Sequence, residues 1–123
     1  MKVSWPILVL LTSLSGLSHA ARIDEARQSL KKWGMAYCLS SAGSNAAVKE
    51  EAGKAMGAYF QLGRHDDEKA YANIRKFIST ELLSNPRVSK QDGHVVALVS
   101  CLDILESKSF LLIVRKQDKY VSR

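Results

Sequence analysis

Residues 23–38 read IDEARQSLKKWGMAYC and carry a regular apolar pattern. Apolar side chains recur there in steps of three and four, which places them on one face of an α-helix. They are Ile23, Ala26, Leu30, Trp33 and Tyr37. Asp24 and Glu25 lie in the first turn, where carboxylates suit the positive end of the helix dipole. The stretch therefore predicts a helix that ends near Gly43, with Cys38 beside its buried face.

Four more helices are expected downstream, at about residues 44–63, 66–85, 94–106 and 110–120. Ser44 or Asn45 is a suitable N-cap for the second helix, and Asn85-Pro86 stops the third. The Val-rich part of 94–106 also fits a strand. The positions expected to face the core are Val48, Ala52, Ala55, Met56, Tyr59 and Leu62 in the second helix, Ala70, Tyr71, Ile74, Phe77, Ile78 and Leu82 in the third, Val95, Leu98, Val99, Leu102 and Leu105 in the fourth, and Leu111, Val114 and Tyr120 in the last. The predicted fold class is all-α, a compact bundle of about five helices.

The first 20 residues read as a cleaved signal peptide. Lys2 precedes a short apolar run, and Ser18 and Ala20 place small side chains on either side of His19, which suits signal peptidase. We expect cleavage after Ala20, which leaves residues 21–123 as one helical domain. The alternative, a membrane anchor, needs roughly 20 consecutive apolar residues, and this run is much shorter. The mature chain is therefore expected to be exported without a membrane span.

Both cysteines of the chain, Cys38 and Cys101, lie in the expected mature part. Outside the cytoplasm an even pair of cysteines favours a disulfide, so we predict that Cys38 is bonded to Cys101. The sequence separation is 101 − 38 = 63 residues, and closing so long a loop stabilises a fold by about 4 kcal/mol through the unfolded chain. The alternative is a catalytic thiol at one of the two positions, served by His65 or His94.

The composition argues against several classes of function. The 18 basic and 12 acidic side chains give a net charge of +6, and the loss of Lys2 on processing would leave about +5. Charges of both signs are interleaved, which favours a solvated surface over a site for an anionic membrane or an acidic protein. Nucleic acid is a poor partner outside the cytoplasm. Isolated histidines give no metal site, and no phosphate-binding or catalytic motif is present, so we expect neither a cofactor nor an enzyme.

Two features of the second helix stand apart from its apolar pattern. Its small residues allow another backbone to approach closely, either within the subunit or across a symmetric dimer interface. They are Ala52, Gly53, Ala55, Gly57 and Ala58. Phe60 is the second feature, because it lies off the main apolar face of the helix.

Two segments resemble a known protein family. They are Met35-Ala36-Tyr37-Cys38-Leu39-Ser40 and the stretch from Cys101-Leu102-Asp103-Ile104 through Ser107-Lys108 to Arg115-Lys116. In order and spacing they are similar to the type VI secretion amidase immunity proteins, of the group that neutralises the fourth amidase class. The resemblance covers nearly the whole mature chain. One difference is Gln117, where the family pattern leads us to expect tyrosine.

The resemblance implies a periplasmic inhibitor. Its partner would be a papain-like cysteine amidase, injected by neighbouring cells to cut the peptide stems of peptidoglycan. It also implies a homodimer that binds two toxins as a heterotetramer.

Two surfaces are candidates for contact with that toxin. The first is the polar connection 87–93, which is long for a bundle and directly precedes the helix of Cys101. Its expected contact residues are Arg87, Lys90, Gln91 and Asp92, and the alternative is a plain solvated loop. The second surface is the outer face of the third helix, with Glu68, Asn73, Arg75 and Lys76.

A different class of function is also open. The chain could be a periplasmic helical module that binds a small ligand or an envelope component in an apolar pocket between its helices. That alternative predicts a sizeable internal cavity and no protein partner, whereas an immunity protein should be encoded beside a small cysteine amidase.

Overall fold

The computed structural model of the chain describes residues 2, 14–43, 45–93 and 96–123. Within these residues the chain forms five α-helices and a closing 3-10 helix, which are α1 Leu14–Ala42, α2 Ala46–Leu62, α3 Glu68–Ser84, α4 Ala97–Glu106, α5 Lys108–Lys116 and η1 Gln117–Tyr120. The predicted all-α bundle of about five helices is confirmed. Because α4 is a helix, the strand alternative for that segment is wrong.

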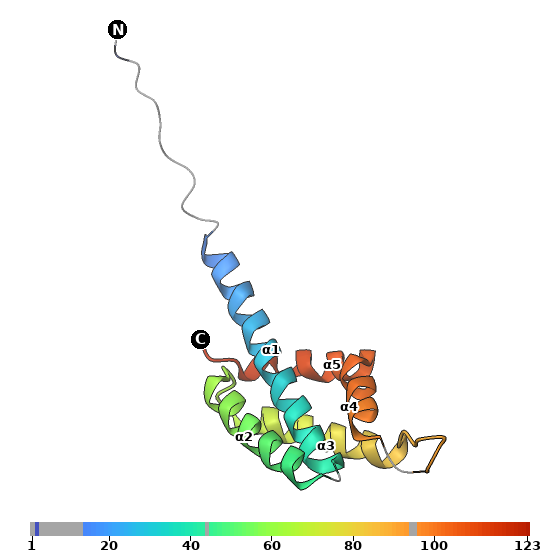
Figure 1. The fold of residues 1–123 in the computed structure, drawn as a ribbon. Coiled ribbons are helices and arrows are strands. Elements are labelled where there is room, and N and C mark those ends of the chain that lie inside the picture. Colours follow the sequence, from blue (N-terminus) through green and yellow to red (C-terminus); the bar gives the residue numbers. More distant parts are fainter. Residues whose placement is uncertain (1, 3–13, 44, 94–95) are drawn as a thin grey trace.

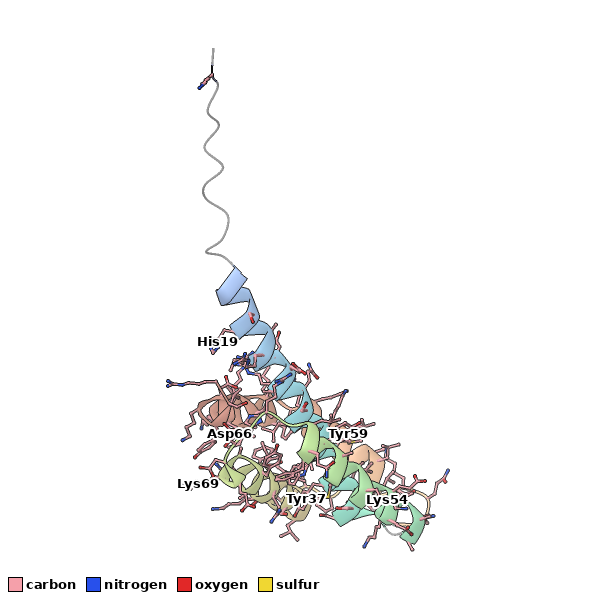
Figure 2. The ribbon with its side chains drawn as sticks, turned by 90° about the vertical axis from the view of Figure 1, so that its left-hand side faces the viewer. His19, Tyr37, Lys54, Tyr59, Asp66 and Lys69 are labelled. Atoms are coloured by element: carbon pink, nitrogen blue, oxygen red, sulfur yellow. A yellow bond between two sulfur atoms is a disulfide. The ribbon has the colours of Figure 1, made fainter. Side chains whose placement is uncertain are left out.

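The longest helix, α1, is the element around which the others pack. It contacts α2, α3, α4, α5 and η1, while its N-terminal turns, which carry His19, project beyond the bundle (Figures 1 and 2). The helix begins before Ile23 and continues through Ala20 and Ala21 without a break. Residues 18–22 contain no Gly or Pro that would stop it. Most of the expected signal peptide, at residues 1 and 3–13, lies outside the described residues.

Side-chain caps begin three of the helices. Asn45 Oδ1 accepts hydrogen bonds of 2.9 and 3.3 Å from two backbone N–H groups in the first turn of α2, as the sequence predicts. Asp67 caps α3 and Ser107 caps α5 in the same way, with N···O distances of 2.9 and 3.1 Å. Each such cap stabilises its helix by about 1 kcal/mol, so local sequence determines where these helices begin.

The core is formed by α1, α3, α4 and α5. Its buried side chains are Leu30, Trp33, Cys38, Ala70, Tyr71, Ile74, Ile78, Cys101, Ile104, Phe110 and Val114. Within this core a disulfide joins Cys38 of α1 to Cys101 of α4, with Cα atoms 5.8 Å apart. The predicted pairing is therefore confirmed. The catalytic-thiol alternative is wrong, because neither of the two cysteines is free.

For α4, the apolar spacing predicts the wrong inward face. The predicted core positions Leu98, Val99 and Leu102 are 53%, 45% and 43% exposed. Cys101 and Ile104 are buried instead. The disulfide explains this rotation of α4, because Cys101 has to face α1.

The predicted inner faces of α2 and α5 are only partly correct. Ala52 is the buried residue of α2, whereas Val48 and Leu62 are exposed, because α2 lies on the outside of the bundle and packs mainly against α1. On α5, Val114 is buried as predicted, but Leu111 is exposed.

The C-terminal segment closes against the connection between α2 and α3. His65 and Val121 form an antiparallel bridge, and two backbone hydrogen bonds of 2.8 Å flank it. Arg27 of α1 donates two hydrogen bonds to the carboxylate of Asp118 in η1. The end of the chain is thus fixed to both α1 and the α2–α3 connection.

Candidate protein-binding site

The α3–α4 loop, of which the structure describes residues 85–93 and 96, projects from the bundle at the C-terminal end of α3 (Figure 1). Arg87 ties this loop to α4. Its Nε lies 2.8 Å from Asp103 Oδ2, its backbone N–H donates to the buried Ser100 Oγ at 3.2 Å, and its carbonyl accepts from Val96 N–H at 2.9 Å. Arg87, which the sequence nominates for toxin contact, therefore anchors the base of the loop.

The tip of the loop is a tight turn from Ser89 to Gly93. Gly93 N–H donates to the Ser89 carbonyl at 2.9 Å, and Gln91 N–H donates to Ser89 Oγ at 3.2 Å. Gly93 has φ of +72°, in the left-handed region that favours glycine. The structure brings the nominated Lys90, Gln91 and Asp92 together as exposed side chains on this turn.

The four nominated residues of α3 are all exposed, but they flank two different hollows. Glu68 and Arg75 line a groove between α1, α2 and α3. Asn73 and Lys76 line a hollow between α3 and α5. Asn73 Nδ2 also donates to Oε1 of the buried Gln117 at 3.0 Å, so this amide already has a role in the fold.

The groove between α1, α2 and α3, here called the aromatic groove, has a volume of about 360 Å³. Trp33, Phe60 and Tyr71 line it together with Glu68 and Arg75. The ring centroid of Tyr71 lies 4.9 Å from that of Phe60 and 5.1 Å from that of Trp33. The off-face position of Phe60 is a sign of this groove in the sequence. Nothing in the sequence shows that Trp33 and Tyr71 border the same hollow.

The loop and the start of the aromatic groove lie toward opposite ends of α3. Glu68 is the first residue of this 17-residue helix and Ser84 the last, which makes it about 25 Å long. Asp66 and Lys69 mark its N-terminal end in Figure 2. The candidate residues therefore do not form one small patch, although a typical protein interface of about 800 Å² per partner could cover both regions.

Within the described part of the chain, two further faces are left uncovered. Leu98, Val99 and Leu102 form an exposed apolar face on α4. On α2, a Cβ atom added at Gly53 or Gly57 would meet nothing within 4 Å. The prediction that small residues of α2 allow close packing within the subunit is wrong at these two glycines, and their use in a dimer stays a prediction.

Burial changes the pKa of two side chains near the α2–α3 connection. The pKa of His65 is lowered from 6.5, first because burial penalises the charged ring, while the Asp118 and Asp66 carboxylates act in the opposite direction. Neither ring nitrogen of His65 has a hydrogen-bond partner in the structure. Burial raises the pKa of Tyr71. Burial is the main cause of both pKa shifts, so they reflect packing.

The described residues were also compared with the requirements of a metal site and of a membrane-spanning helix. Residues 2, 14–43, 45–93 and 96–123 contain no group of three or more His, Cys, Asp or Glu that could hold a metal ion. Among the helices of the same ranges, none has the length and apolar character needed to cross a membrane.

Comparison with known proteins identifies the family. A family model named Tai4, described as type VI secretion system (T6SS) amidase immunity protein, matches residues 28–114. No curated protein matches the chain. The matched region runs from α1 into α5 and contains the disulfide, the α3–α4 loop and the aromatic groove. Because the match spans well over half of the sequence, the chain belongs to the Tai4 family of T6SS amidase immunity proteins.

Proposed function

We propose that the chain is a periplasmic immunity protein that binds a type VI secreted peptidoglycan amidase and occludes its active-site cleft. The amidase would be a papain-like cysteine peptidase, and its inhibition would protect the producing cell. The observation that supports this function is the family match over residues 28–114. Occlusion needs no catalytic group, because a rigid surface that excludes substrate is sufficient.

The α3–α4 loop is the element proposed to enter the cleft. Its tip, Ser89 to Gly93, is closed by its own hydrogen bonds, and Arg87 ties its base to α4. The disulfide then links α4 to α1. A loop that is ordered before binding loses little conformational entropy on association, so Lys90 and Gln91 would be presented at low entropic cost.

Replacement of Lys90-Gln91-Asp92 by Gly-Ser-Gly tests the loop. We expect affinity to fall by about tenfold or more, because hydrogen bonds to charged groups contribute about 1.5–3 kcal/mol each. The measurement is calorimetric titration against the amidase encoded by the adjacent gene, with its catalytic cysteine replaced by alanine. The control removes the exposed ion pair of α2 (Glu50→Ala with Lys54→Ala) and should bind like wild type.

Two outcomes of this titration are distinct. Wild-type affinity in the loop variant would refute the loop as the inserted element and leave the function standing. No complex between wild type and the amidase, or no amidase gene beside this one, would refute the proposed function.

Export is the second part of the proposal. Residues 1–20 would be removed as a signal peptide, and residues 21–123 would fold in the periplasm. The mass of protein released from the periplasm should correspond to a chain that begins at Ala21 and contains one disulfide. An intact N-terminus on that protein would contradict the proposed cleavage.

A homodimer that binds two amidases is the third part. The face of α4 with Leu98, Val99 and Leu102 is the favoured interface, since exposed apolar side chains of this size often mark protein contacts. The small-residue face of α2 is the alternative. Sedimentation of wild type at micromolar concentration should show a dimer, and Leu102→Glu should convert it to monomer. A wild-type monomer would rule the dimer out.

A further inference from the structure

Arg75 lies over two aromatic rings of α1. Its Cζ atom is 5.9 Å from the ring centroid of Trp33 and 5.8 Å from that of Tyr37. The two rings are nearly parallel, at 3°, with centroids 5.7 Å apart. The Tyr37 hydroxyl also shares a hydrogen bond of 2.7 Å with Ser79 Oγ of α3. The pair of rings over which the guanidinium lies is therefore held from both α1 and α3.

The hydrogen-bonding capacity of Arg75 is unused. Among the described residues the ion pairs involve Arg27, Lys54, Arg64 and Arg87, and Arg75 makes neither an ion pair nor a hydrogen bond. Glu68, the acidic residue of the same groove, precedes it by seven positions, about 10 Å along the helix. A cation–π contact with the two rings does not use the N–H donors of the guanidinium.

A carboxylate is the group that best matches a guanidinium with unused N–H donors. A guanidinium binds carboxylate through two parallel hydrogen bonds, which gives both energy and orientation. The rings of Trp33, Phe60 and Tyr71 beside it offer contact to an apolar group. With a volume of about 360 Å³, the groove is at the small end of ligand pockets. It fits one or two side chains better than a whole helix.

We propose that the aromatic groove receives an acidic side chain of the amidase, paired with Arg75, and a neighbouring apolar side chain. This inference rests on the proposed function. Charge complementarity favours this occupant, because the processed chain would have a net charge of about +5 and Arg75 is the unpaired cation of the groove. Arg, Trp and Tyr are also the residue types that dominate the energetics of protein interfaces. The groove would be a second contact, separate from the α3–α4 loop.

A charge variant tests the carboxylate contact. Arg75→Gln should weaken binding of the cysteine-to-alanine amidase by about tenfold or more, because the buried carboxylate loses its charged partner. Lys69→Gln removes the same charge from an exposed position on α3 that does not line the groove, and its affinity should stay near wild type. Arg75→Lys keeps the charge but loses the two-pronged geometry, so its affinity should be intermediate.

A steric variant tests the groove without changing charge. Ala72 lines the groove from an exposed position on α3, so Ala72→Leu should fill part of it and weaken binding. Ala47→Leu makes the same change at an exposed position in the first turn of α2, outside the groove, and should bind like wild type. Thermal unfolding of all variants separates lost contacts from lost folding.

A double-mutant cycle can then identify the partner. Asp and Glu residues of the amidase are replaced one at a time by Asn and Gln. For one of these replacements, the fold-loss of affinity together with Arg75→Gln should differ from the product of the two separate fold-losses. If none does, the carboxylate contact is refuted.

The remaining outcomes each decide one point. Wild-type affinity in folded Arg75→Gln and Ala72→Leu would refute the groove as a contact site for the amidase but leave the proposed function intact. No complex with wild type would overturn the function and this inference together. Calorimetric binding of a free peptidoglycan stem tetrapeptide, lost in Arg75→Gln, would show that the groove takes a cell-wall peptide and would overturn the amidase as its occupant.

Discussion

We expect His65 to make the stability of the fold depend on pH. The residue is 8% exposed, its two ring nitrogens lack hydrogen-bond partners in the structure, and burial lowers its pKa from 6.5. The unfolded ring takes up a proton as the pH falls through about 6.5, whereas the folded ring resists it. The free energy of unfolding is therefore unaffected well above this pH and decreases below it.

His65→Phe should remove this dependence. The ring of His65 lies edge-on to Tyr71, with centroids 6.2 Å apart, so phenylalanine keeps an aromatic contact. As the pH falls from about 7.5 to 5.5, wild type should lose more unfolding free energy than the variant. Urea unfolding at the two pH values measures the difference. Equal losses would show that His65 does not sense pH.

Two glycines should respond oppositely to alanine. A Cβ atom at Gly63 would overlap the hydroxyl of buried Tyr71, so Gly63→Ala should lower the unfolding free energy by about 1–3 kcal/mol. Gly53 is helical and meets open space, so Gly53→Ala should raise it by about 0.5–1 kcal/mol. Thermal unfolding compares them. An unchanged unfolding free energy in Gly63→Ala would mean that the Tyr71 side chain shifts without cost.

At the scale of the helices, sequence spacing predicts α3 well and α4 poorly. The inner face of α3 is distinct in the sequence because its other side is polar, and four of its predicted core positions are buried. In contrast, α4 carries apolar residues around most of its circumference, so spacing alone does not select a face. The predicted disulfide supplies the missing information, because Cys101 must face the core.

The candidate site shows the same limit. The polarity of residues 87–93 identifies the loop, but the role of Arg87 depends on Ser100 and Asp103 in the next helix. The aromatic groove combines side chains of three helices. Local patterns predict helices and loops, whereas a groove between helices depends on their rotation and packing.

Loosening the base of the α3–α4 loop should change its order more than the stability of the bundle. The Arg87–Asp103 ion pair is about half exposed, so Arg87→Ala should cost less than about 1 kcal/mol of unfolding free energy. The amide hydrogens of Gln91 and Gly93 should nevertheless exchange faster, because the turn loses its attachment to α4. Hydrogen exchange followed by mass spectrometry measures this change. If the exchange rates are the same as in wild type, the turn is ordered by its own hydrogen bonds and not by its attachment to α4.

At the scale of the whole molecule, the disulfide is a large contribution that a double variant can remove. The double variant Cys38→Ser with Cys101→Ser should lose about 4 kcal/mol of unfolding free energy, since the loop between the two residues is long. Urea unfolding measures the loss, and wild type unfolded in reducing buffer is the control. A loss below about 1 kcal/mol would mean that packing of α1 against α4 holds the bundle without the bond.

If residues 1–20 are removed as proposed, the uninterrupted course of α1 sets an order of events during biogenesis. The bond between Ala20 and Ala21 lies inside the helix, and peptidases prefer flexible, extended backbone. Processing at this bond would therefore have to happen while the emerging polypeptide is still uncoiled at the membrane. A precursor that completes its first helix too early would become a poor substrate and would stay tethered by its leader.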